Sequence, residues 1–232
     1  MTVDQAVKLI DSATKLAGAL AWPFLVGLVV LRFAPALRLF FENLGELSLK
    51  GGGFEASAKR RQAEAAAALA AAAAATPESG ASSQLAARNA REAVEVVAEM
   101  VTPTILRRAR KTTILWVDDR PDNNVYERQS LEALGISFVL AKSTDEAVER
   151  VKAQQFDVII SDMSRPPDQT AGYTLLDLLR KSGDPTPFII YAGSNAPEHK
   201  AEARKRGAVG STNRAAELFE FVMSALRGLT QR

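Results

Sequence analysis

The carboxyl-terminal half of the chain alternates apolar runs of strand length with amphipathic runs of helical length. The strand-length runs are almost wholly apolar, as the strands of a parallel sheet are when helices cover both of its faces. Strands are expected at residues 112–119, 136–143, 156–163, 186–194 and 208–211. Helices are expected at residues 123–135, 144–155, 172–183, 197–207 and 215–229, the second of them capped by Ser143 or Thr144. The pattern predicts an α/β fold with a five-stranded parallel sheet wound on both sides.

Three carboxylates stand at the ends of two of these strands. Asp118 and Asp119 end the first strand and Asp162 ends the third. In the common strand order 2-1-3-4-5 these two strands are neighbours, and ligands bind at the carboxyl ends of the strands. Three acids in one pocket repel one another unless a cation neutralises them. Any one of them alone is explained as a solvated acid at a strand end. Their coincidence favours a divalent ion bound by Asp119, Asp162 and a main-chain carbonyl just after Asp162.

The composition limits which ion and which partners are expected. The chain has no cysteine and a single histidine, His199, in a polar, charged stretch, so cysteine and multi-histidine metal sites are excluded. Oxygen ligands favour Mg²⁺ or a similar hard ion. The 29 basic and 27 acidic residues nearly balance, with no basic stripe interleaved with aromatics, so no nucleic acid partner is expected.

Small and polar residues surround the predicted pocket. Arg165 follows Asp162 closely and either contacts a phosphate or nucleotide or pairs with an aspartate. Pro166 and Pro167 stiffen the same loop. The loop that contains Gly193 and Ser194, together with "GSTNR", offers groups that suit an anionic or polar ligand. Ordinary turn chemistry explains these residues equally well.

The first region, residues 1–49, contains an apolar stretch. Residues 16–31 carry no charge, but a helix of that length spans only about 24 Å, short of the roughly 30 Å of a bilayer core. Residues 33–41 extend the stretch if Arg32 and Arg38 reach the headgroups. We expect a single membrane-spanning helix; the alternatives are a buried helix of a soluble domain and a helical hairpin that only enters the bilayer.

Basic residues are more frequent after this stretch than before it. The positive-inside rule then places the carboxyl-terminal domain in the cytoplasm. We expect the protein to be a single-pass protein of the inner (cytoplasmic) membrane.

The second region, residues 50–111, reads as a helical connector. Residues 55–75 are rich in alanine, with strong helix propensity and almost no large apolar face, so an exposed spacer is expected there. A second helix is expected from about residue 84 to 101, with a narrow apolar stripe. That stripe fits equally well a partner helix in a homodimer and packing on the chain's own globular domain.

The third region, residues 112–232, resembles the receiver domain of two-component response regulators. Its acidic pair corresponds to Asp118 and Asp119, and its phosphoacceptor aspartate to Asp162. The resemblance implies that Asp162 takes a phosphoryl group from a histidine kinase with the help of Mg²⁺. It implies that Asp119 binds the metal directly and Asp118 through water, and that the carbonyl of Ser164 completes the protein ligands.

The spacing of the site residues matches the family, but the residue types differ from the family at two positions. Asp162 lies 43 residues after Asp119, Ala192 a further 30, and Arg214 a further 22. These last two positions hold a hydroxyl residue and a lysine in the family. Alanine has no hydroxyl to bond a phosphoryl group, although Ser194 takes its place if the fourth strand is shifted. Arginine keeps the charge but not the shape of lysine.

Three functions fit these features. The first is a membrane-anchored, non-enzymatic signalling protein that accepts phosphate on Asp162 or binds a ligand or partner in the same pocket. The second is a pseudo-receiver adaptor that recruits partners to the membrane without being phosphorylated. The third is a metal-dependent phosphohydrolase, for which the sequence offers neither a general acid nor a substrate cap.

Overall fold

The computed structural model describes residues 53–75 and 83–228. The predicted membrane segment lies outside these residues. Among the helices that are described, none combines the length and the apolar character that crossing a bilayer requires.

A five-stranded parallel sheet with strand order β2-β1-β3-β4-β5 forms the centre of residues 113–228, which confirms the predicted fold. Its strands are β1 Thr113–Val117, β2 Ser137–Ala141, β3 Val158–Asp162, β4 Phe188–Tyr191 and β5 Gly210–Thr212. The helices between and after them are η2 Pro121–Asn124 (a 3₁₀ helix), α5 Val125–Glu132, α6 Thr144–Ala153, α7 Ala171–Lys181, α8 Pro197–Lys205 and α9 Ala215–Gly228. Ser143 caps α6, since its Oγ accepts a hydrogen bond from Glu146 N at 3.1 Å.

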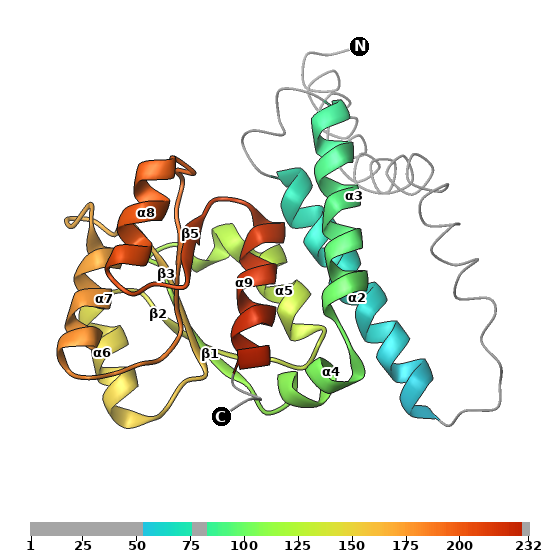
Figure 1. The fold of residues 1–232 in the computed structure, drawn as a ribbon, viewed down its shortest axis with the longest axis horizontal. Coiled ribbons are helices and arrows are strands. Elements are labelled where there is room, and N and C mark those ends of the chain that lie inside the picture. The colour runs from blue at the N-terminus through green and yellow to red at the C-terminus, as the bar shows by residue number, and fades with distance from the viewer. Residues whose placement is uncertain (1–52, 76–82, 229–232) are drawn as a thin grey trace, which may run out of the picture. The chain divides into compact units, whose positions relative to one another are not determined.

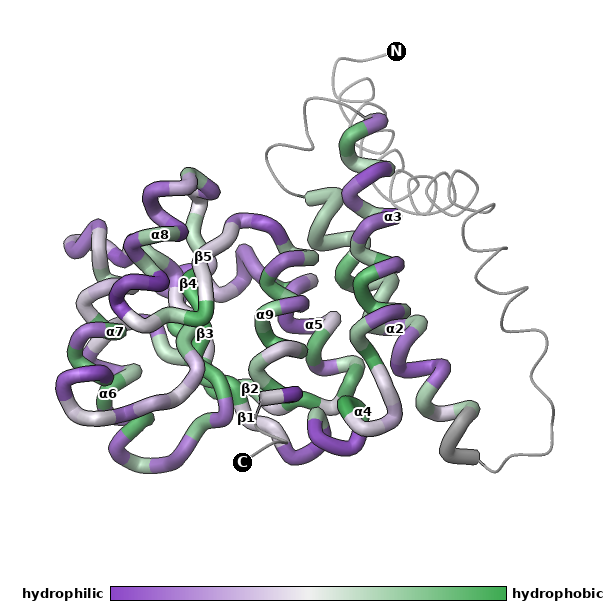
Figure 2. Tube along the Cα trace, in the orientation of Figure 1, coloured by the Kyte–Doolittle hydropathy of each residue, from purple (hydrophilic) through white to green (hydrophobic). Residues whose placement is uncertain are grey.

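Alternation along the strands divides the core between the two faces of the sheet. Ile114 and Trp116 of β1 face the helices α5 and α9, whereas Leu115 and Val117 face α6, α7 and α8. These side chains are at most 1% exposed. Figure 2 shows the same concentration of apolar residues in the central strands, with polar residues on the outer surfaces of the helices. Burial on both faces explains why the strands lack the polar–apolar alternation of a half-exposed sheet.

In the described part of the chain, three helices precede the sheet, and they pack against the helical layer formed by α5 and α9. They are α2 Gly53–Ala75, α3 Ser83–Met100 and α4 Pro103–Ala109. In Figure 1, α2 and α3 lie side by side outside α5 and α9, and the contacts agree, because α2 meets α5 and α3 meets α9. Residues 53–232 group as one compact unit.

The predicted exposed spacer is therefore wrong for α2. Leu69 is only 1% exposed, and alanines on the same side of the helix, such as Ala65 and Ala72, are buried with it. Alanine gives no conspicuous apolar face, but its small side chain lets helix backbones approach closely, and its burial costs no side-chain entropy. Gln62 strengthens the contact by donating a hydrogen bond from Nε2 to Val101 O at 2.6 Å.

Of the predicted apolar stripe, Val94, Val97 and Val101 pack on the chain's own globular domain, whereas Leu85 is 38% exposed. Ala93, Val96, Val97 and Val101 are buried in the same core cluster as Val222 of α9. Of the two alternatives that the sequence left open for this stripe, the contact within the chain is the one found.

Candidate functional site

The three carboxylates meet at the carboxyl edge of the sheet. Asp118 and Asp119 follow β1, and Asp162 is the last residue of β3, whose Ser161 pairs with Val117 of β1. One carboxylate oxygen from each of the three aspartates lies within 4.8 Å of the other two. This cluster follows directly from the parallel pairing of the two strands.

Hydrogen bonds from the following loop hold Asp118. Its Oδ1 accepts from Arg120 N at 2.7 Å and its Oδ2 accepts from Asn124 Nδ2 at 2.5 Å. The residue is only 5% exposed. Asp119 is more open, and one of its oxygens lies 3.5 Å from Nε of Arg120. A carboxylate held by two donors keeps a fixed orientation toward its neighbours.

Asp162 sits in an unfavourable electrostatic environment. Burial raises the pKa of this carboxyl, and the charge of Asp118 raises it further, against the opposing effects of the amides of Met163 and Ser164 and of the charge of Arg165. The Met163 amide donates to Oδ1 at 2.7 Å. Burial without a compensating cation disfavours the ionised form.

Arg165 supports the loop behind Asp162 rather than the pocket in front of it. Its guanidinium donates to Ser161 Oγ at 2.6 Å and to the carbonyl oxygens of Asp162 at 2.5 Å and Ala171 at 3.0 Å. The side chain is 4% exposed and does not line the cavity above the carboxylates. The guanidinium thus binds main-chain and hydroxyl oxygens, while its charge lowers the pKa of Asp162; the contact with a phosphate stays a prediction.

A cavity of about 570 Å³ opens above the three aspartates. Ala192 and Gly193, two of the residues predicted for a ligand pocket, line it, and so does Ser164, whose carbonyl is a predicted metal ligand. Ser194 and Arg214 do not. Ser194 Oγ lies 2.9 Å from Nδ1 of His199.

The side chain of Arg214 turns away from the cavity toward Glu92 of α3, with Nη2 2.5 Å from Oε1.

Glu127 and Tyr191 are cavity residues that sequence reasoning missed. Tyr191 Oη donates to Glu127 Oε1 at 2.9 Å. Glu127 is 7% exposed, and burial raises its pKa. The sequence contains a signal for the burial of Glu127, because this residue precedes Leu131 by one helical turn and so lies on the buried face of α5.

The end of α2 supplies another unexpected wall of the cavity. Ala72 and Ala75 line it, although they precede the first strand by almost forty residues in the chain. Their presence links the helical region before the sheet to the rim of the carboxylate cluster.

The cluster fits a hard divalent cation. Its ligand atoms are all oxygens, and the carboxylates converge on one point at the mouth of a cavity. Mg²⁺ prefers such ligands and keeps several waters, for which a cavity of this size leaves room.

Replacing Asp162 by asparagine should stabilise the metal-free protein more at neutral than at acidic pH. The folded pKa of Asp162 is raised, so its contribution to stability is complete below the unfolded value of about 3.9 and is lost as the pH rises through the folded value. Thermal unfolding of the full chain in a chelator, from pH 4 to pH 7.5, measures this. We expect the gain in melting temperature of Asp162→Asn over the unsubstituted chain to grow with pH. Asp145→Asn, at an exposed position in the first turn of α6, is the control. A gain for Asp162→Asn that is constant across this range contradicts the expectation.

The chain is similar to several solved structures of response regulators. The structure of the Francisella response regulator 1452 receiver domain shares 25% sequence identity, covering 51% of this chain and 98% of that chain with a TM-score of 0.45. The chemotaxis response regulator CheY4 of Vibrio cholerae shares 25% identity, covering 52% of this chain and 97% of that chain with a TM-score of 0.39. The Thermotoga maritima response regulator TrrA, in complex with Mg²⁺-BeF, shares 20% identity, covering 49% of this chain and 98% of that chain with a TM-score of 0.43.

No match was found among curated proteins. The family model of the response regulator receiver domain matches residues 114–216, a little less than half of the chain. That segment contains the three clustered aspartates and the five strands except Thr113, the first residue of β1. Residues 114–216 are therefore a response regulator receiver domain.

Proposed function

We propose that this receiver domain accepts a phosphoryl group on Asp162, with Mg²⁺ bound by Asp118, Asp119, Asp162 and the main-chain carbonyl of Ser164. The observation that carries the proposal is the meeting of three carboxylate oxygens within 4.8 Å of one another at the edge of an open cavity. The family match to residues 114–216 supports it.

The side chain of Asp162 is the nucleophile of the proposed reaction. A carboxylate oxygen attacks the phosphorus of a histidine kinase phosphohistidine or of another phosphodonor. The new O–P bond forms as the bond from phosphorus to the donor breaks, and the donor leaves with the electron pair. Bound Mg²⁺ offsets the negative charge of the transferring group and of the carboxylates. The Met163 amide, which donates to Oδ1 at 2.7 Å, fixes the orientation of the attacking carboxyl.

In this account the domain is a signalling module rather than an enzyme that turns over a substrate. The phosphoryl group stays on the protein as the signal, and the donor supplies the specificity.

An intact-mass measurement tests the phosphoacceptor directly. The full chain is incubated with Mg²⁺ and acetyl phosphate, and we expect one phosphoryl adduct. Asp162→Ala should abolish the adduct because it removes the nucleophile. Asp145→Ala, an exposed aspartate at the beginning of α6, should leave it unchanged. Equal modification of the wild-type chain and Asp162→Ala would place the phosphoryl group elsewhere and refute the assignment.

A specific observation favours a second candidate, the adaptor that is not phosphorylated. Ala192 lines the cavity where the family has a hydroxyl, and Arg214 is bonded to Glu92 instead of facing the cavity. In that case the cavity and the surrounding helices bind a partner directly. Absence of an adduct in the wild-type chain, under conditions in which another receiver is modified, supports this candidate.

We further propose that residues 16–41 anchor the protein in the inner membrane and leave the receiver domain in the cytoplasm. The support is the long apolar stretch with an excess of basic residues after it. Anchoring would confine the domain and its phosphodonor to one surface and would favour contact between two copies of the chain.

Removal of residues 1–49 tests the anchor. We expect the full chain to sediment with membranes and to resist extraction by alkaline carbonate, and the shortened chain to appear in the soluble fraction. Retention of the shortened chain in the membrane pellet, or carbonate extraction of the full chain, contradicts the proposal.

A further inference from the structure

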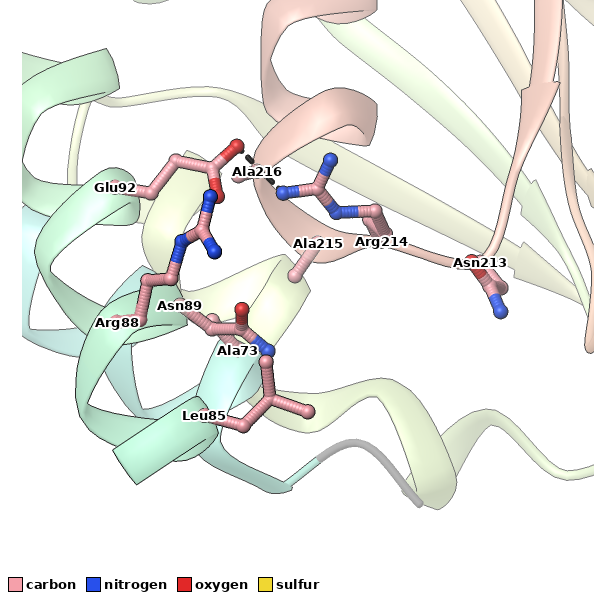
Figure 3. Close-up of a pocket in the computed structure, with 9 residues that line it drawn as sticks. All are labelled: Ala73, Leu85, Arg88, Asn89, Glu92, Asn213, Arg214, Ala215 and Ala216. Carbon is pink, nitrogen blue, oxygen red and sulfur yellow. Dashed lines mark hydrogen bonds and ion pairs between the residues drawn. The ribbon is translucent and has the colours of Figure 1, made fainter. Parts of the chain in front are cut away.

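A second cavity lies between the amino-terminal half of α3 and the loop from β5 to α9. Its volume is about 280 Å³. Figure 3 shows Arg88, Asn89 and Glu92 reaching toward it from α3, with Arg214 opposite them at the start of α9. Asn213 lines both this cavity and the larger one above the aspartates, so the two adjoin at this residue.

The pair between Arg214 and Glu92 bridges the receiver domain and α3 across this cavity. Nη2 of Arg214 lies 2.5 Å from Oε1 of Glu92, and the two side chains are 41% and 40% exposed. The partners are 122 residues apart in the chain. An ion pair of this exposure adds little to stability, so a competing anion can replace one of its members.

The backbone places Arg214 within range of such an anion. Thr212 pairs with Tyr191, and Tyr191 pairs with Asp162, so β5 lies two strands from the phosphoacceptor, roughly 10 Å away. The loop itself is held, because Arg214 N donates to Thr212 Oγ1 at 3.0 Å and Thr212 Oγ1 donates to Glu217 Oε2 at 2.6 Å. The long side chain of Arg214 is therefore the part that can move.

The two halves of α3 differ in how many of their apolar side chains are buried in the core. From Ala93 onward the helix buries Ala93, Val96 and Val97 in the core, and Val101 just after it is buried there as well. Before that point Ala90 is buried, whereas Leu85 and Arg88 are exposed. The pair with Arg214 is thus one of several contacts of a half-helix that buries fewer apolar side chains than residues 93–100.

We propose that phosphorylation of Asp162 releases the amino-terminal half of α3 by drawing Arg214 away from Glu92. The guanidinium exchanges one carboxylate for the phosphoryl oxygens, which carry more charge and accept two parallel hydrogen bonds. Residues 83–92 then loosen, while residues 93–100 stay packed on α9. The inference rests on the proposed phosphorylation of Asp162 and assigns its output to the helices that precede the receiver domain.

The release also changes the rim of the phosphorylation site. Ala73 of α2 lines the smaller cavity, and its neighbour Ala72 lines the larger one. The end of α2 and the start of α3 therefore both border the cavities that the movement of the Arg214 side chain changes. In the chain, α2 follows the apolar residues 16–41. The helices α2 and α3 are therefore the segments through which the release would act on the amino-terminal region.

Amide hydrogen exchange of the full chain, read by mass spectrometry, tests the release. The chain is compared with and without Mg²⁺ and acetyl phosphate, and the intact mass of each sample is recorded. We expect exchange in residues 83–92 to become roughly two- to five-fold faster in the phosphorylated sample, the range that loss of an exposed ion pair gives. Exchange in residues 93–100 should stay unchanged.

Two variants and a control sharpen the test. Glu92→Gln should speed exchange in residues 83–92 without phosphodonor, and phosphorylation should add little further change. Arg214→Ala should do the same. Glu95→Gln, at an exposed position one turn later on α3, should behave as the wild type.

Different outcomes separate the two proposals. An adduct on Asp162 with unchanged exchange in residues 83–92 overturns the release and leaves the phosphoacceptor standing. The absence of an adduct overturns the proposed function and the release with it. Slow exchange in Glu92→Gln, equal to that in Glu95→Gln, contradicts the role of the ion pair.

Discussion

The mutual repulsion of Asp118, Asp119 and Asp162 is the constraint on which the site depends. The strand order brings them together, and burial raises the pKa of Asp162. Three neighbouring groups donate hydrogen bonds to these carboxylates: the side-chain amide of Asn124 and the main-chain N–H groups of Arg120 and Met163. These donors orient the acids without neutralising them. Such an arrangement favours a hard divalent cation, and in our proposal the bound cation precedes phosphorylation of Asp162.

The helices that precede the sheet help to explain the two departures from the receiver pattern, at Ala192 and Arg214. Ala192 offers no hydroxyl to a phosphoryl group, and Arg214 is engaged with Glu92 of α3. The outer side of α9 is covered, because α2 and α3 of the same chain pack against it. Residues 114–216 therefore pack against helices of the same chain, and the pair between Arg214 and Glu92 is one of the contacts that join the two parts.

The sequence predicted the sheet and the acidic cluster because both depend on local patterns: apolar runs identify the strands, and parallel strands bring their ends together. It did not predict the burial of α2, because a run of alanines has no apolar periodicity and Leu69 alone marks the buried side. Nor could spacing show that Arg214 turns to Glu92, a partner 122 residues away. Contacts between distant segments depend on the packing of helices on the sheet, which no local pattern encodes.

Calorimetric titration of the full chain with Mg²⁺ tests the central claim most directly, because metal binding is the consequence of the clustered carboxylates that requires no donor or partner. The account predicts that a single Mg²⁺ binds per chain, that Asp119→Asn abolishes this binding, and that Asp145→Asn, at an exposed position on α6, retains it. A chain that binds no Mg²⁺, or an Asp119→Asn variant that binds it as the wild type does, would contradict the account.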